Sequence, residues 1–185
     1  MLEVGYPRDL AMIGAIFGMA TFVWAGWAQE APPRHRSWRL VLALLGLSGI
    51  ALMFLSVPMA VRHWATATAL QSGSVALTIY IVAFWVEIVV AGGLAFLAHR
   101  TGRSDLIAPL VLAVVGVHFI ALAPVFDQPV LYLAAVLLTA IAIVAASMPR
   151  GRVARSFWCG LISSPVFLGI GVWSAVAASD AFARL

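Results

Sequence analysis

The 185-residue chain is 64% hydrophobic and 10% charged, and its mean hydropathy is +1.07. Because soluble domains have about 45–50% apolar and about 25% charged residues, this composition excludes a soluble globular protein and favours the bilayer. The net charge is +4, from eleven arginines and no lysine against seven acidic residues. In a membrane protein such a charge orients loops, so we expect a lipid partner and no nucleic acid.

Six windows are apolar enough and long enough to cross a hydrocarbon layer of about 30 Å, which takes about 20 helical residues. In chain order they are Leu10–Trp27, Leu40–Met59, Ser74–Ala98, Ile107–Phe126, Val130–Met148 and Phe157–Ala178. Because a backbone in lipid must satisfy its own hydrogen bonds, and no alternating strand pattern occurs, all six are expected to be helices. The connections are too short to separate domains. The sequence therefore predicts an all-α polytopic membrane protein, one six-helix domain over residues 1–185.

The first window follows a segment that carries Glu3, Arg8 and Asp9. A cleavable signal peptide needs a positively charged start, so we expect the first helix to be retained. Within that helix, Gly14 and Gly18 form a G-x-x-x-G pattern, which favours close contact between helices. The pattern suits packing inside the bundle, and it also offers a face for a homo-oligomer.

Arginines are concentrated in three alternate connections between the windows. These eight residues are Arg34, Arg36, Arg39, Arg100, Arg103, Arg150, Arg152 and Arg155. Since basic loops stay in the cytoplasm, the positive-inside rule places both termini outside. Tryptophan favours headgroup depth, and four tryptophans at predicted helix ends agree with the boundaries: Trp27, Trp38, Trp64 and Trp158.

The third window contains Glu87, its only acidic residue, within one residue of the centre. An ionised carboxylate at that depth costs at least about 2.5–3.5 kcal/mol on insertion scales. Glu87 is therefore expected to be protonated, paired or facing a wet cavity. Tyr80 lies on the same helix face two turns toward the outer side, so we include it as a candidate for binding or proton relay.

The fourth window contains His118. Consecutive helices joined by a short loop run antiparallel, and Glu87 and His118 each lie 11 residues from the cytoplasmic ends of their windows. At about 1.5 Å per residue they reach the same depth, so we predict that they meet. The pair is either a neutral hydrogen bond that joins two helices, worth about 0.6 kcal/mol on average, or a proton relay or ligand-binding site.

The segment around the histidine also carries a resemblance. After the mid-helix glutamate, a G-[LV]-H-F-x-x-L-A pattern is matched by Gly116, Val117, His118, Phe119, Leu122 and Ala123. On these residues the middle third of the chain resembles a group of small bacterial multi-pass inner-membrane proteins. Ala121 stands where that group has proline. The resemblance implies a bacterial inner-membrane protein and no particular activity.

Prolines mark the last two helices. Pro124 and Pro129 flank the connection between the fourth and fifth windows, where they are expected to stop one helix and start the next. Pro165 lies inside the sixth window, directly after Ser163 and Ser164. We expect a bend there, with the freed carbonyl groups bonded by these serines or by a neighbouring helix.

No pattern in the chain indicates a catalytic residue, a metal site or another cofactor. The single cysteine is Cys159, and His35, His63 and His99 have no second ligand at helical spacing.

The leading hypothesis is a small proton-linked transporter or channel-like protein that uses the pair of Glu87 and His118. Two alternatives stay open: a non-catalytic subunit or sensor whose Arg-rich loops bind a partner, and a membrane enzyme that acts on a lipid or quinone. A hydrated cavity at the pair would favour transport, and a sealed pair would favour a structural role. An opening toward lipid would favour the enzyme.

Overall fold

The computed structural model describes residues 5–149 and 151–184, and this part of the chain is helical without strands. Its helices are α1 (Pro7–Trp27), α2 (Arg36–Arg62), α3 (Val75–Arg100), α4 (Ile107–Phe126), α5 (Val130–Ser147) and α6 (Arg155–Phe182), with a 3-10 turn, η1 (Ser104–Leu106), before α4. Each of the six long helices is apolar enough to cross a membrane. The predicted fold class, an all-α six-helix bundle, is confirmed.

The helix ends differ from the predicted windows by a few residues. The bounds of α4 coincide with the predicted ones, whereas α2 and α6 are longer at both ends. The extra residues of α2 include Arg36 and Arg62, because a helix continues into the headgroup region where polar side chains are tolerated.

Pro124 does not stop α4, contrary to expectation. The helix continues to Phe126 and ends at Asp127, whose φ of 52° is left-handed. The amide of Gln128 then donates to the carbonyl of Ala123 at 2.9 Å. A proline in the last turn removes one hydrogen bond only, so α4 tolerates it near its end.

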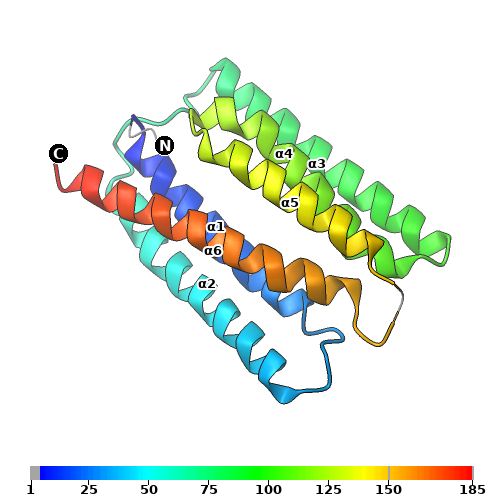
Figure 1. Ribbon diagram of the computed structural model, residues 1–185. Coiled ribbons are helices and arrows are strands. Elements are labelled where there is room, and N and C mark those ends of the chain that lie inside the picture. The colour runs from blue at the N-terminus through cyan, green and yellow to red at the C-terminus, as the bar shows by residue number, and fades with distance from the viewer. Residues whose placement is uncertain (1–4, 150, 185) are drawn as a thin grey trace.

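The helices form two neighbouring groups (Figure 1). One group contains α1, α2 and α6, and the other contains α3, α4 and α5; α6 also packs against α4 and α5. The groups meet at three aromatic rings, where Phe17 of α1 lies 5.2 Å from Phe119 of α4 and 5.4 Å from Phe167 of α6. The aromatic contact between the two groups therefore joins α1, α4 and α6, although these helices are distant in the sequence.

Glycines bring α1, α2 and α6 close together. A methyl group on Gly18 would lie 2.6 Å from the carbonyl oxygen of Gly49, and one on Gly14 would lie 2.8 Å from the hydroxyl of Ser56. The face of α1 that carries the G-x-x-x-G pattern is thus covered by the same chain. A homo-oligomer through Gly14 and Gly18 stays a prediction.

Polar side chains fasten the loop between α2 and α3 to the start of α1. The carboxylate of Asp9 is 6% exposed and accepts hydrogen bonds from the Thr68 hydroxyl at 2.8 Å and the Ala69 amide at 2.7 Å. Arg8 donates to the carbonyl of Trp64, and its guanidinium lies 4.7 Å from that residue's ring centre. These contacts hold the connection that leads into α3.

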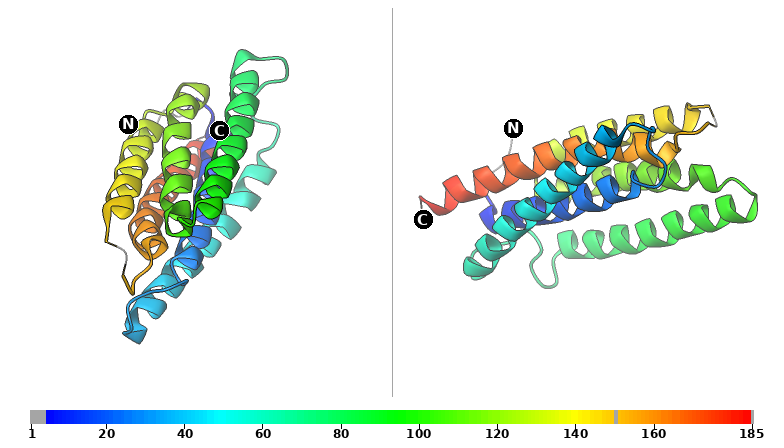
Figure 2. Two further views of the ribbon diagram at one scale, coloured as in Figure 1. Left: turned by 90° about the vertical axis from the view of Figure 1, so that its right-hand side faces the viewer. Right: turned by 90° about the horizontal axis from the view of Figure 1, so that it is seen from below.

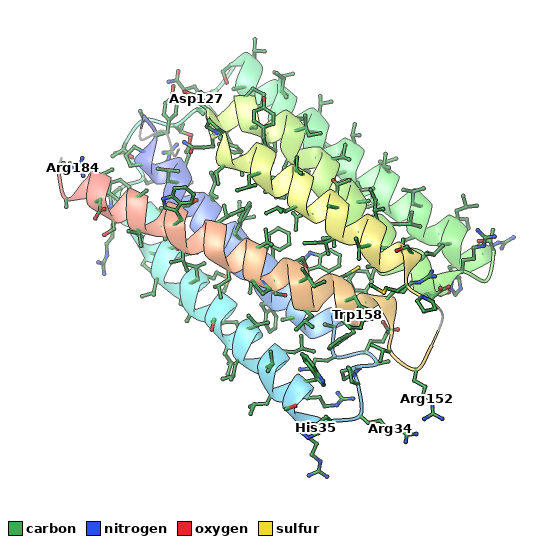
Figure 3. All side chains as sticks on the ribbon, in the orientation of Figure 1. Arg34, His35, Asp127, Arg152, Trp158 and Arg184 are labelled. Carbon is green, nitrogen blue, oxygen red and sulfur yellow. The ribbon has the colours of Figure 1, made fainter. Side chains whose placement is uncertain are left out.

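The other end of the bundle is joined by a second set of polar contacts. Ser156 donates to the carboxylate of Glu30 at 2.7 Å, and Arg155 donates to Asp105 at 2.8 Å. The start of α1 and the end of α6 lie at the end of the bundle opposite to these loops (Figures 1 and 3). Figure 3 places Arg34 and Arg152 at the end of the bundle where α1 connects to α2 and α5 to α6. It places Asp127 and Arg184 at the opposite end.

Candidate functional site

Glu87 and His118 are the two polar side chains near the middle of α3 and α4. Glu87 lies 12 residues after the start of α3 and 13 before its end. His118 Nδ1 is 3.5 Å from Glu87 Oε2, and the two side chains are 10% and 22% exposed, respectively. The structure thus brings together the residues whose depths agree in the sequence. The distance exceeds the usual hydrogen-bond range of about 2.7–3.2 Å, so this is an electrostatic contact rather than a short hydrogen bond.

The pair lies on a groove of about 460 Å³ between α3 and α4. Besides Glu87 and His118, the lining residues are Ala83, Val86, Val90, Leu94, Leu110, Ala113, Val114, Val117 and Ala121. All of these nine are apolar. The volume falls within the range of about 300–1,000 Å³ typical of small-molecule sites, which combine apolar walls with a few polar groups.

The groove opens sideways because its rim side chains are accessible from outside the bundle. Val86 of α3 and Val117 of α4 are each 54% exposed. In a bilayer this flank faces lipid chains. A molecule dissolved in the membrane therefore has a lateral route to Glu87 and His118.

The position of α3 creates the groove. This helix lies along one edge of the bundle (Figures 1 and 2) and packs against α4 and η1, with few contacts elsewhere. Ala98, near its end, is its one buried residue. The small side chains of Ala83, Ala113 and Ala121 leave space next to the pair, so the two helices do not close over it.

Tyr80 does not join the pair. It precedes Glu87 by seven residues, which is about 10 Å along a helix. Its ring lies edge-on to that of Phe126, with centres 6.0 Å apart, and it is not among the residues that line the groove. Tyr80 therefore packs where the first half of α3 meets the end of α4.

Ser163 and Ser164 are buried and Pro165 is exposed, and none of the three lines the groove. α6 runs through Pro165 as one continuous helix. Ser164 donates to the carbonyl of Thr21 at 3.4 Å, and the buried Ser163 hydroxyl has no partner among the described residues. Neither serine bonds a carbonyl freed by Pro165, because Ser164 joins α6 to α1 instead; bonding of those carbonyls by a neighbouring helix stays a prediction. A bend at Pro165 stays a prediction.

Within residues 5–149 and 151–184, no three side chains of His, Cys, Asp or Glu gather as a metal site would require. The histidines other than His118 have separate neighbours. His35 contacts Ser37 at 2.6 Å, His63 stacks on Phe182 with ring centres 3.8 Å apart, and His99 contacts Ser104 at 3.4 Å. These contacts are local to helix ends.

Two features of the site region were missed by sequence reasoning. The first is the lateral groove, which depends on how α3 sits against α4 and leaves no signal in the chain. The second is the role of Asp9 in fastening the loop before α3, for which an acidic residue in the first turn of an apolar helix was an available signal.

Fold and site together define a class: a protein whose six helices are long and apolar enough to cross a membrane, with an acid–base pair in a lateral apolar groove. The comparisons with known proteins found no matching family model, no matching curated protein and no matching solved structure. The function is therefore argued from the site itself.

Proposed function

We propose that this protein is a small proton-linked membrane transporter whose substrate binds in the groove between α3 and α4. The observation that carries the proposal is the contact of Glu87 with His118, at 3.5 Å, on a groove that is otherwise apolar. Ionisable residues are rare inside membrane-spanning segments and mark substrate pathways or proton relays. The pair supplies the proton site, and the groove supplies the substrate site.

The pair holds one proton readily because two groups share it. Low-dielectric surroundings disfavour a lone carboxylate and a lone imidazolium, while attraction between the two offsets both penalties. The proton therefore rests on either partner, and the pair without it carries one negative charge. Binding of the substrate in the groove would therefore be coupled to the uptake and release of that proton.

A membrane enzyme that takes a lipid or quinone from the bilayer is the second candidate, and the lateral opening is the observation that favours it. Glu87 and His118 would then act as acid and base. The groove lining contains no hydroxyl or thiol that could serve as a nucleophile. Substrate binding with proton exchange needs only the acid–base pair and the apolar walls, and the groove supplies both. We therefore prefer transport to catalysis.

We also propose a bacterial inner membrane with both termini outside. The bundle places both ends of the chain at one side and the arginine-rich loops at the other (Figure 3). The positive-inside rule assigns the arginine-rich side to the cytoplasm. The resemblance around His118 supports the bacterial assignment.

Labelling with dicyclohexylcarbodiimide tests the proton site. The O–H of a protonated carboxyl group adds across a C=N bond of this apolar reagent, and acyl transfer from oxygen to nitrogen leaves a stable N-acylurea. We expect mass spectrometry to find the adduct on Glu87, in amounts that decrease as the pH rises. Glu87→Gln should abolish it, whereas Asp180→Asn, at an exposed site near the end of α6, should not.

Absence of the adduct on Glu87 at every pH would refute a protonated carboxyl group open to the membrane. Labelling that does not change with pH would contradict an exchangeable proton. Either result would remove the basis of proton-linked transport by this protein.

A further inference from the structure

We infer that the substrate is a lipophilic cation, which the groove exchanges one for one against the proton on Glu87 and His118. This inference rests on the proposed transport function and adds the chemical class of the substrate. It is carried by the charge balance of the groove.

The groove has two charge states. With the proton, the pair is neutral overall, whether it consists of two neutral groups or of a carboxylate and an imidazolium. Without the proton, the carboxylate of Glu87 leaves one negative charge beside neutral His118. In apolar surroundings a net charge is costly, so the second state requires one positive charge from elsewhere.

Among the described residues of α3, α4 and η1, no charged group near the pair supplies that positive charge. In α3 the other ionisable residues are Tyr80, His99 and Arg100, and Arg100 is 13 residues from Glu87, about 20 Å along the helix. In α4 the ionisable residue is His118, and η1 contributes Asp105, which bonds to Arg155 at the loop end. Since none of these described residues supplies the missing positive charge, it must come from a proton or from the ligand.

The shape of the groove suits an apolar body around that charge. Its lining extends from Ala83 to Leu94 on α3, 11 residues or about 16 Å along the helix. The walls are alanine, valine and leucine side chains, which offer contact without hydrogen bonds. A hydrated inorganic cation would lose its water there without replacement ligands, whereas a cation shielded by hydrocarbon loses little.

Other ligand charges fit less well. A neutral molecule leaves the deprotonated pair unbalanced, and an anion adds a second negative charge to it. A lipophilic cation neutralises the carboxylate and displaces the proton to water, so that charge is conserved in the exchange and no covalent bond of the ligand changes.

Tetraphenylphosphonium binding to the purified full-length protein in detergent tests the inference. In weakly buffered solution we expect each bound cation to release about one proton, and binding to weaken by up to about tenfold for each unit of decreasing pH while the pair is protonated. Glu87→Gln should lose both the binding and the release. Asp180→Asn should retain both. The neutral analogue tetraphenylsilane and the anion tetraphenylborate should not release protons.

A second variant covers the case in which Glu87→Gln fails to fold. Ala113→Phe keeps the carboxylate and fills the groove, so it should lose tetraphenylphosphonium binding, while infrared difference spectroscopy should still find a carboxyl C=O band that titrates with pH. Undiminished binding by folded Ala113→Phe would overturn the groove as the cation site.

The outcomes separate the two proposals. Binding of the cation without proton release, or preferred binding of the neutral or anionic probe, would overturn the substrate class while carbodiimide labelling of Glu87 still supports proton-linked transport. Absence of both cation binding and labelling would overturn both.

Discussion

Glu87 and His118 each provide the polar partner that lipid does not offer to the other. Removal of one side chain leaves the other without its partner, which costs about 1–3 kcal/mol when the remaining group is neutral. We predict that Glu87→Ala and His118→Ala each lower the thermal stability of the protein in detergent. Val117→Ala, one residue before the histidine and 54% exposed, is a matched control that should change little.

The double variant tests whether the two residues are coupled. Since the second substitution removes a group that has already lost its partner, the double variant should lose less stability than the two single variants together. Losses that simply add would contradict an energetic link between the residues, even at a distance of 3.5 Å.

Asp9 gives a second prediction at the level of single residues. Its buried carboxylate accepts from the Thr68 hydroxyl and the Ala69 amide, and hydrogen bonds to charged groups contribute about 1.5–3 kcal/mol. Asp9→Asn replaces one acceptor oxygen by a donor and should lower the melting temperature in detergent. The same change at exposed Asp180 should leave it unaltered, and equal effects at both positions would argue against the loop anchor.

Close contacts between α1 and α6 depend on single glycines. A methyl group at Gly160 would overlap the carbonyl of Trp24, whereas one at Gly169 would meet no atom within 4 Å. We predict that Gly160→Ala destabilises the protein by about 1–3 kcal/mol, the usual cost of overpacking. Gly169→Ala should be neutral or stabilise it by up to about 1 kcal/mol, because alanine favours helix. Thermal unfolding of the two variants checks this contrast, and equal stabilities would contradict the packing of α6 on α1.

Helices were predictable from the sequence, but most of their contacts were not. Lipid forces an apolar run of about 20 residues into a helix whatever its neighbours, so α4 could be bounded from hydropathy alone. The contact of α1 with α6 joins the two ends of the chain, and no spacing encodes it. Ser164 illustrates the consequence: its bond to Thr21 depends on that contact, so its partner could not be predicted from its place next to Pro165.

The sequence predicted that Glu87 and His118 lie at the same depth, but it did not predict the groove around them. Glu87 and His118 could be matched because antiparallel helices of known rise fix the relative depth of their residues. Tyr80 lies on the same helix face, yet it contacts Phe126 and not the pair, because seven residues of helix separate it from Glu87 by about 10 Å. The groove follows from the edge position of α3, which hydropathy does not specify.

At the scale of the bundle, the start of α1 and the end of α6 lie at one end, and Arg34 and Arg152 lie at the other (Figure 3). We predict that alkaline phosphatase fused to the C-terminus is active in bacteria and that a fluorescent protein fused there is dark, because the arginines hold their loops in the cytoplasm. Neutralising the arginines of the three loops should weaken this preference. A fluorescent C-terminal fusion without phosphatase activity would reverse the proposed orientation.

Infrared difference spectroscopy across a pH titration tests most directly whether Glu87 and His118 share an exchangeable proton. We predict a protonated-carboxyl C=O band that disappears reversibly as the pH rises, is absent from Glu87→Gln, and shifts in frequency and midpoint in His118→Ala. A spectrum in which no titrating carboxyl band belongs to Glu87, or in which that band is the same without His118, would contradict it.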